Sequence, residues 1–232
     1  MIRTLFFLAF FAFLFLQCNS NKTMKQTDNV GAPSGNSMDS AKKEVFILED
    51  EIDNGFVELT SLDASIHIDI KYATADNFVK EKMYNCGRAY LRPEVAAAVV
   101  IAHKKLQKQG LGLKIFDAYR PRPFQQRLWD KMPDDRYVTN PKKGSMHNRG
   151  AAVDLTIVDK NGKDLDMGTP FDFFGERAYQ TYTDLPKKVL ENRKLLRETL
   201  AEVGFKHIRT EWWHYSFTKK QYALSDWLWE CK

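Results

Sequence analysis

The sequence lacks a dense basic stripe, an apolar run long enough to cross a bilayer, and any internal repeat. Its 35 Lys and Arg residues are scattered among 30 Asp and Glu residues, and they leave a formal charge of only +5. Proteins that bind nucleic acid normally carry a clustered basic face and a motif to match. We therefore expect no nucleic acid among the partners of this chain.

The N-terminal residues are predicted to be a signal segment. Leu5–Leu16 is an apolar run of twelve residues, which is shorter than the roughly 20 needed to span a bilayer and fits the apolar part of a secretory signal. It follows Arg3 and is followed by Cys18, so residues 1–18 resemble a bacterial lipoprotein signal in which Cys18 is lipidated. The residues just before Cys18 lack the usual small side chain, and an ordinary cleaved signal or an uncleaved anchor are the alternatives.

The rest of the chain divides into a tether and one domain. Residues 19–44 are rich in Asn, Ser, Gly, Thr and Lys and are predicted to be flexible. Residues 45–232 contain regularly spaced apolar residues and no second linker, so they are predicted to form a single domain with a full core. Together these segments predict an exported protein of the periplasm or cell envelope, tethered to a membrane by a lipid anchor.

Two cysteines, Cys86 and Cys231, fall within the predicted domain. In an exported protein such a pair is a candidate for a disulfide. The alternative is two free, buried cysteines that pack as small apolar residues.

The pattern of apolar residues predicts an α+β fold with a central, mainly antiparallel sheet flanked by helices. Strands and helices do not alternate regularly, which argues against a doubly wound sheet. The expected strands are residues 66–70, 113–118, 151–158 and 210–217, and the expected helices are residues 93–109 and 124–131 and a long helix after Asp184. In the long helix Asp184 is the expected cap and Gly204 the terminator, and its basic residues are predicted to face solvent.

One set of residues has the composition of a catalytic zinc site. His147, Asp154 and His214 offer three ligands, which leaves a fourth zinc position open for water. Glu211 lies three residues before His214, and a carboxylate at that place can act as general base on such a water. We expect the zinc site at the sheet, with one Zn²⁺ per chain.

The spacing of Glu211 and His214 creates a geometric conflict with the predicted strand over residues 210–217. Positions three apart on a regular strand face opposite sides. The two side chains can therefore share one site only if the strand bulges, twists or ends between them. Trp212 and Trp213 could hold such an irregularity by packing on either side.

The sequence resembles the D-alanyl-D-alanine dipeptidases, which are VanX-type zinc peptidases related to the bacterial DD-carboxypeptidases. The resemblance covers most of the predicted domain and keeps the order of its segments. Five segments carry it: residues 71–78, 117–121, 145–154, 167–174 and 211–215.

This resemblance implies a role for each matching residue. It implies that His147, Asp154 and His214 bind zinc, that Glu211 is the general base, and that Arg120 stabilises the oxyanion. It also implies that three residues bind the free amino end of a small peptide substrate, D-Ala-D-Ala: Asp172, Ser145 and Tyr72. From the residue types alone, Arg120 could instead form a structural salt bridge, Asp172 could cap a helix, Ser145 could stabilise its own loop, and Tyr72 could belong to the core.

The leading hypothesis is therefore a zinc dipeptidase that releases D-alanine in cell-wall turnover or scavenging. A zinc DD-carboxypeptidase that acts on peptidoglycan stem peptides is the alternative. A non-catalytic zinc module that binds a cell-wall fragment is a third hypothesis, but a purely structural site would need neither Glu211 nor Arg120.

Overall fold

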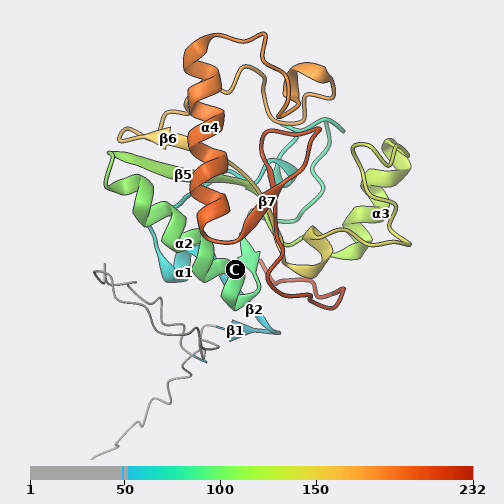
Figure 1. The fold of residues 1–232 in the computed structure, drawn as a ribbon. Coiled ribbons are helices and arrows are strands. Elements are labelled where there is room, and N and C mark those ends of the chain that lie inside the picture. The colour runs from blue at the N-terminus through green and yellow to red at the C-terminus, as the bar shows by residue number, and fades with distance from the viewer. Residues whose placement is uncertain (1–48, 50–51, 232) are drawn as a thin grey trace, which may run out of the picture.

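The computed structural model describes Glu49 and residues 52–231, which are built around a five-stranded sheet (Figure 1). The strand order is β3-β5-β6-β8-β7, and only the β3–β5 pair is parallel. The strands are β3 (His67–Ile68), β5 (Leu111–Asp117), β6 (Ala152–Asp159), β8 (His214–Phe217) and β7 (Phe205–His207). The predicted α+β fold with a mainly antiparallel sheet is confirmed.

Helices α2 and α4 cover one face of this sheet. The α-helices are α1 (Leu59–Leu62), α2 (Pro93–Gln107), α3 (Arg122–Lys131) and α4 (Lys187–Glu202). Helix α2 packs on β5, and α4 packs on β6, β7 and α2. Fully buried residues of the two central strands, such as Ile115 and Leu155, fill the core. The α3 helix lies apart from this layer (Figure 1).

A smaller sheet and three short 3₁₀ helices complete the described structure. The small sheet is antiparallel, in the order β1 (Ile52–Asp53), β2 (Phe56–Glu58) and β4 (Tyr90–Leu91). The 3₁₀ helices are η2 (Lys71–Ala73), η3 (His147–Arg149) and η4 (Glu176–Ala178). No helix among the described residues is long and apolar enough to cross a membrane. The predicted signal and tether, including Cys18, lie outside the described residues.

The register of the central strands places three polar residues in one row. Asp154 of β6 pairs with His214 of β8 on one side and with Asp117 of β5 on the other. The β5–β6 register shifts between Ile115 and Asp117. Since side chains alternate between the two faces of a sheet, a shift of one residue changes which face a side chain occupies. The irregularity therefore puts the side chain of Asp117 on the same face of the sheet as the side chain of Asp154.

Gly150 links the η3 turn to β6 in a conformation that a larger residue would not accept. Its φ is +65°, in the left-handed region, and a Cβ at this position would lie 2.5 Å from the Phe56 ring. Glycine tolerates the positive φ without steric cost. The chain can therefore turn between His147 and Asp154 and bring both to one site.

Several predicted boundaries and one predicted exposure are wrong. The strand expected over residues 66–70 spans only His67–Ile68, and the helix expected over residues 124–131 begins at Arg122. The strand expected over residues 210–217 begins only at His214. The residue that caps α4 is Pro186 rather than Asp184, and no side chain caps this helix. Arg193 of α4, which the charge pattern placed in solvent, is only 3% exposed, because its guanidinium binds backbone carbonyls of a neighbouring loop.

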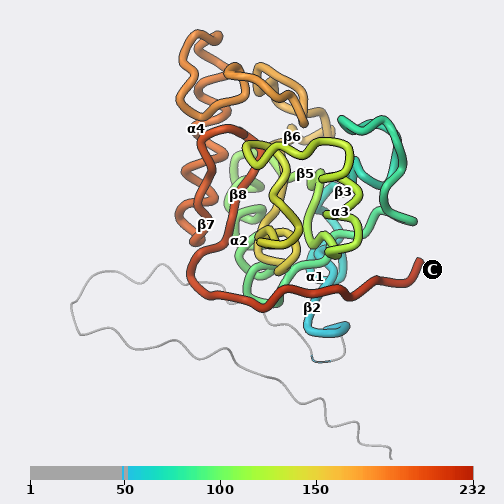
Figure 2. Tube along the Cα trace, turned by 90° about the vertical axis from the view of Figure 1, so that its right-hand side faces the viewer, coloured from blue at the N-terminus to red at the C-terminus, as the bar shows by residue number. Residues whose placement is uncertain are grey.

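Residues 218–231 form an extended segment that crosses the domain after β8 (Figure 2). Trp227 stacks on Phe56 and packs edge-on against Tyr90. A disulfide joins Cys86 to Cys231 and fastens the end of this segment. The segment therefore belongs to the folded domain.

Candidate metal centre

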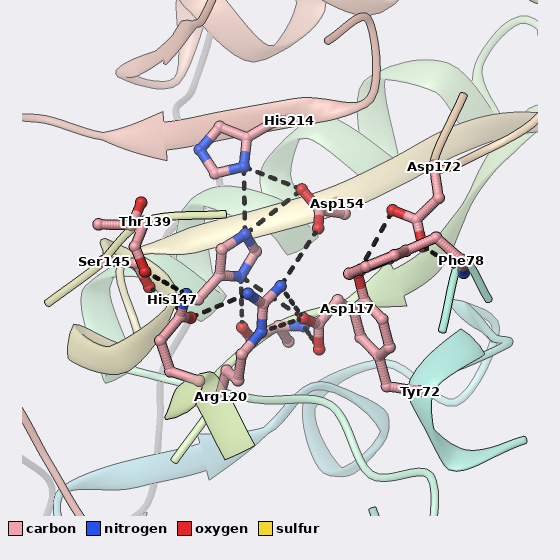
Figure 3. Close-up of polar contacts among 12 residues, drawn as sticks. Tyr72, Phe78, Asp117, Arg120, Thr139, Ser145, His147, Asp154, Asp172 and His214 are labelled. Atoms are coloured by element: carbon pink, nitrogen blue, oxygen red, sulfur yellow. Dashed lines mark hydrogen bonds and ion pairs between the residues drawn. The ribbon is translucent and has the colours of Figure 1, made fainter. Parts of the chain in front are cut away.

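Three potential metal ligands lie together at the row formed by β6 and β8 (Figure 3). His147 Nε2 lies 3.1 Å from His214 Nδ1 and 3.4 Å from Asp154 Oδ1, and His214 Nδ1 lies 3.0 Å from Asp154 Oδ1. Four-coordinate zinc with bonds of about 2.0–2.1 Å separates its ligand atoms by about 3.3 Å. The triangle fits one such ion, and two imidazoles with a carboxylate are ligands that zinc accepts.

Hydrogen bonds to the other ring nitrogens orient both imidazoles. His147 Nδ1 donates to the carbonyl oxygen of Ala118 at 2.7 Å, so its Nε2 is free to bind a metal. His214 Nε2 lies 3.0 Å from Ser216 Oγ, which leaves Nδ1 facing the other ligands. Partners of this kind are typical of metal-binding histidines.

Electrostatics favour the metal-binding protonation state at His214 and Asp154. Burial lowers the pKa of His214, which favours the neutral imidazole. Burial alone would lower the pKa of His147 as well, but the carboxylates of Asp154 and Asp117 raise it. Burial alone would raise the pKa of Asp154, but His147 and His214 hold it well below its usual range. The site therefore presents an anionic carboxylate beside a neutral imidazole.

The irregular chain before β8 lets Glu211 and His214 belong to one site. Glu211 lies in the connection between β7 and β8, so the strict alternation of a strand does not apply to it. Trp212 and Trp213 meet at a ring angle of 89°, and the indole of Trp212 donates to Thr169 Oγ1 at 2.8 Å. These contacts fix the turn, and they resolve the geometric conflict posed by the spacing.

The carboxyl of Glu211 has the electrostatic character of a proton acceptor in a buried site. The residue is 7% exposed. Its pKa is raised well above its usual value because burial removes water and because the carboxylates of Asp154 and Asp172 add negative charge, with Arg120 opposing them. A raised pKa matches a group that must hold a proton for part of a reaction.

The guanidinium of Arg120 is clamped beside the triangle. Nε and Nη2 donate to Asp117 Oδ2 at 3.0 and 2.7 Å, and Nη1 donates to Gln125 Oε1 at 3.0 Å. Nη2 also lies 4.0 Å from Asp154 Oδ2. These bonds use three of the five N–H donors, so donors on both terminal nitrogens are left for a further acceptor.

Asp172 stands on the other side of Tyr72 from Arg120 (Figure 3). The Tyr72 hydroxyl donates to Asp172 Oδ1 at 3.3 Å, while its ring lies 5.1 Å below the Arg120 guanidinium carbon. Asp172 Oδ2 accepts from the backbone N–H of Phe78 at 3.4 Å. Asp172 has a φ of +59°, a conformation that non-glycine residues adopt rarely and often at functional sites. The residue does not cap a helix.

Helix α4 holds the loop that carries Asp172. The Arg193 guanidinium donates to the carbonyls of Met167, Arg177 and Tyr179, at 2.7 Å, 2.8 Å and 3.2 Å. The contacts lie on both sides of Asp172 in the sequence. A buried arginine that binds carbonyls in this way fixes the backbone of the loop.

Ser145 lies beside the site, but its hydroxyl has partners within the protein. It accepts from the backbone N–H of Asn148 at 3.2 Å and lies 3.4 Å from Gln125 Oε1. Its role in substrate binding therefore stays a prediction.

Comparison with known proteins identifies the family. Residues 52–227 match the family model described as D-ala-D-ala dipeptidase. The chain belongs to this dipeptidase family. It is 38% identical over 159 residues to the D-alanyl-D-alanine dipeptidase of Escherichia coli K12, a match that covers 68% of this chain and 82% of the relative. It is 31% identical over 192 residues to the enzyme of the same name from Enterococcus faecalis V583, covering 74% of this chain and 95% of the relative.

Among solved structures, the chain is similar to VanYB in complex with D-alanine-D-alanine, with 15% identity and a TM-score of 0.39. The match covers 56% of this chain and 72% of that one. As a member of the dipeptidase family, the chain is a peptidase, and the family together with the His–Asp–His cluster indicates a metal.

Sequence reasoning missed the residues that hold Arg120. In the sequence, Asp117 stands out only as a member of the segment 117–121 that carries the resemblance, and nothing marks Gln125. An aspartate three residues before an arginine was the only available signal for Asp117. For Gln125, a helical residue that is fully buried, only the tertiary structure reveals the contact.

Asp172 makes the stability of the metal-free dipeptidase depend on pH. Loss of water around the carboxyl and the charge of Asp154 raise its pKa to about 8, whereas an unfolded chain releases this proton near pH 4. The folded state therefore becomes less favoured as pH rises from 4 to 8. Asn is neutral, similar in shape and tolerated at positive φ.

We therefore expect Asp172→Asn to raise the melting temperature of the metal-free protein at pH 8 by several degrees, and to change it little at pH 4. Thermal unfolding of both proteins across this range, followed by circular dichroism, measures the effect. Parallel pH curves for the two proteins would contradict the assignment.

Proposed function

We propose that this chain is a zinc-dependent dipeptidase that hydrolyses D-Ala-D-Ala to two molecules of D-alanine. The observation that carries the proposal is the position of Asp172, which bonds to Tyr72 on the side away from Arg120 and lies within electrostatic range of Asp154 in the His–Asp–His triangle. A carboxylate in this position is suited to the free ammonium of a very short peptide. Relatives named D-alanyl-D-alanine dipeptidases support the choice of substrate.

The three ligands and the residues around them divide the chemistry. Zinc bound by His147, Asp154 and His214 would supply a water of lowered pKa and polarise the peptide carbonyl. Glu211 accepts a proton from the attacking water as the oxygen bonds to the carbonyl carbon. It returns that proton to the leaving amine when the C–N bond breaks. The net reaction consumes one water for each peptide bond.

Arg120 stabilises the negative charge that develops on the carbonyl oxygen. Its cation is already oriented by Asp117 and Gln125, so little reorganisation is needed during the reaction. The guanidinium stays protonated at all relevant pH values. Asp172, with Tyr72 as its hydrogen-bond donor, binds the ammonium group and sets the length of substrate that fits.

Blocking the amino group of the substrate tests this recognition. Acetylation removes the positive charge and leaves Asp172 without a partner, and loss of one member of such a pair costs about 2–5 kcal/mol. We expect kcat/KM for N-acetyl-D-Ala-D-Ala to be at least about 30-fold below that for D-Ala-D-Ala. Release of D-alanine by zinc-loaded protein is the measurement, with L-Ala-L-Ala as a stereochemical control. Equal rates on both D,D-substrates would favour a DD-carboxypeptidase instead.

The variant Glu211→Gln tests the role of the base. Glutamine keeps the size of the side chain but cannot accept the proton, so we expect kcat to fall by about 10³-fold, within the range for general bases. Zinc content should stay at one per chain, because Glu211 is not part of the ligand triangle. His214→Ala is the matched control, which should lose metal as well as activity. Normal hydrolysis by Glu211→Gln would reject the mechanism.

We also propose that the protein is exported and lipidated at Cys18. The apolar run Leu5–Leu16, Cys18 and the polar residues after it support export, and the Cys86–Cys231 disulfide suits an oxidising compartment. An exported enzyme would act on dipeptides from wall turnover or scavenging and not on a cytoplasmic precursor. In cell fractionation, we expect the wild-type protein in the membrane fraction and the Cys18→Ser variant outside that fraction. Full-length wild-type protein in the cytosol would refute this proposal.

A further inference from the structure

Tyr84 contacts Asp117, the carboxylate partner of Arg120, and is not one of the residues expected to touch a substrate. It is 1% exposed, and its hydroxyl donates to both oxygens of Asp117, at 3.0 Å to Oδ1 and 3.2 Å to Oδ2. Asp117 in turn binds Nε and Nη2 of Arg120 through Oδ2. The carboxylate of Asp117 therefore connects the Tyr84 hydroxyl to the Arg120 guanidinium by hydrogen bonds on both sides.

The geometry of Asp117 depends on few donors. Its carboxylate is fully buried, and besides Arg120 it accepts from the backbone N–H of Ala118 at 3.0 Å and from Tyr84. The Ala118 bond fixes one point of the carboxylate, while Tyr84 reaches both oxygens from another side. Without the Tyr84 hydroxyl, only the Ala118 N–H, apart from Arg120 itself, would hold the orientation of the Asp117 carboxylate. Because Arg120 binds through two nitrogens, a turn of the carboxylate plane would turn the guanidinium as well.

The ring of Tyr84 is itself held in place. Its centroid lies 5.0 Å from Phe124, 5.9 Å from Tyr72 and 5.4 Å from Trp229. The backbone N–H of Tyr84 donates to the Tyr72 carbonyl at 2.9 Å. The disulfide joins Cys86 and Cys231, each two residues after one member of the Tyr84–Trp229 pair. The surroundings would therefore keep a phenylalanine ring where the tyrosine ring is.

We propose that Tyr84 is a positioning residue for the reaction, which sets the orientation of the Arg120 guanidinium through Asp117. The inference rests on the proposed function, because it assigns Arg120 to the oxyanion. Arg120 has N–H donors left on Nη1 and Nη2. The direction of these donors follows from the hydrogen bonds that Asp117 accepts from Nε and Nη2 of the same guanidinium. Errors of about 1 Å in such placement can cost 10²-fold in rate.

Tyr84→Phe tests the proposal, since it removes only the hydroxyl. We expect kcat for D-Ala-D-Ala to fall about tenfold, with KM within about twofold and zinc content unchanged. This split follows because the Tyr84 hydroxyl bonds to neither Asp172 nor a metal ligand, and because phenylalanine keeps the ring contact with Tyr72. Melting temperature is measured alongside, so that loss of folded protein is separated from loss of rate.

A matched control removes the same kind of bond elsewhere. The hydroxyl of Tyr222 donates to Glu94 Oε2 at 3.2 Å, a phenol–carboxylate bond outside the site. Tyr222→Phe should leave kcat within about twofold of the wild-type value. A similar drop in both variants would show a general loss of stability and overturn the positioning role.

A double-mutant cycle with Arg120→Lys shows whether Tyr84 acts through Arg120. Lysine lacks the planar fork whose direction Asp117 sets, so Tyr84→Phe should have little further effect on kcat in this background. The same tenfold loss in both backgrounds, or no loss in the single variant, would refute the proposal. If the wild-type zinc-loaded protein itself fails to release D-alanine, the proposed function is wrong, which is a separate result.

Discussion

The site depends on one row of cross-strand pairs, Asp117–Asp154–His214. Antiparallel pairing places partners on adjacent strands within about 5 Å of one another, so the sheet alone brings a carboxylate and an imidazole together at one point. The register shift in β5 adds Asp117 to this row, and with it the guanidinium of Arg120. Metal binding and oxyanion binding are therefore neighbours because of one strand register.

Charge balance explains why so many acidic groups can share this small volume. Asp117 is neutralised by its direct pair with Arg120. Asp154 reaches the same guanidinium only at 4.0 Å, and Asp172 and Glu211 form no ion pair among the described residues. Burial, and after it this excess of negative charge, raises the pKa values of Asp172 and Glu211. Under the proposed function, a divalent ion and the substrate ammonium bring three positive charges to these three acids. Binding and charge neutralisation are then the same event, and a substrate without its ammonium is at a disadvantage.

The sequence contained enough to predict the fold class and the candidate ligands, because both depend on local patterns of apolar and metal-binding residues. It did not show how the chain changes direction. The boundary of β8 at His214 is set by the packing of Trp212 and Trp213, and the shift in β5 leaves no mark in the alternation of residues. Arg193 was misjudged because a charged residue on a helix usually faces solvent. Its partners are carbonyls of a loop distant in sequence, which only the tertiary structure reveals.

The disulfide has a topological consequence of its own. Cys86 and Cys231 are 145 positions apart, and the whole row, the metal ligands, Asp172 and Glu211 lie between them. The bond closes this stretch into a covalent ring. A single cut of the backbone anywhere within that ring would leave both fragments linked by the disulfide. Residues 86–231 thus stay covalently connected after a first cut, whereas a cut before Cys86 would leave the upstream segment held only by non-covalent contacts, such as the pairing of β3 with β5.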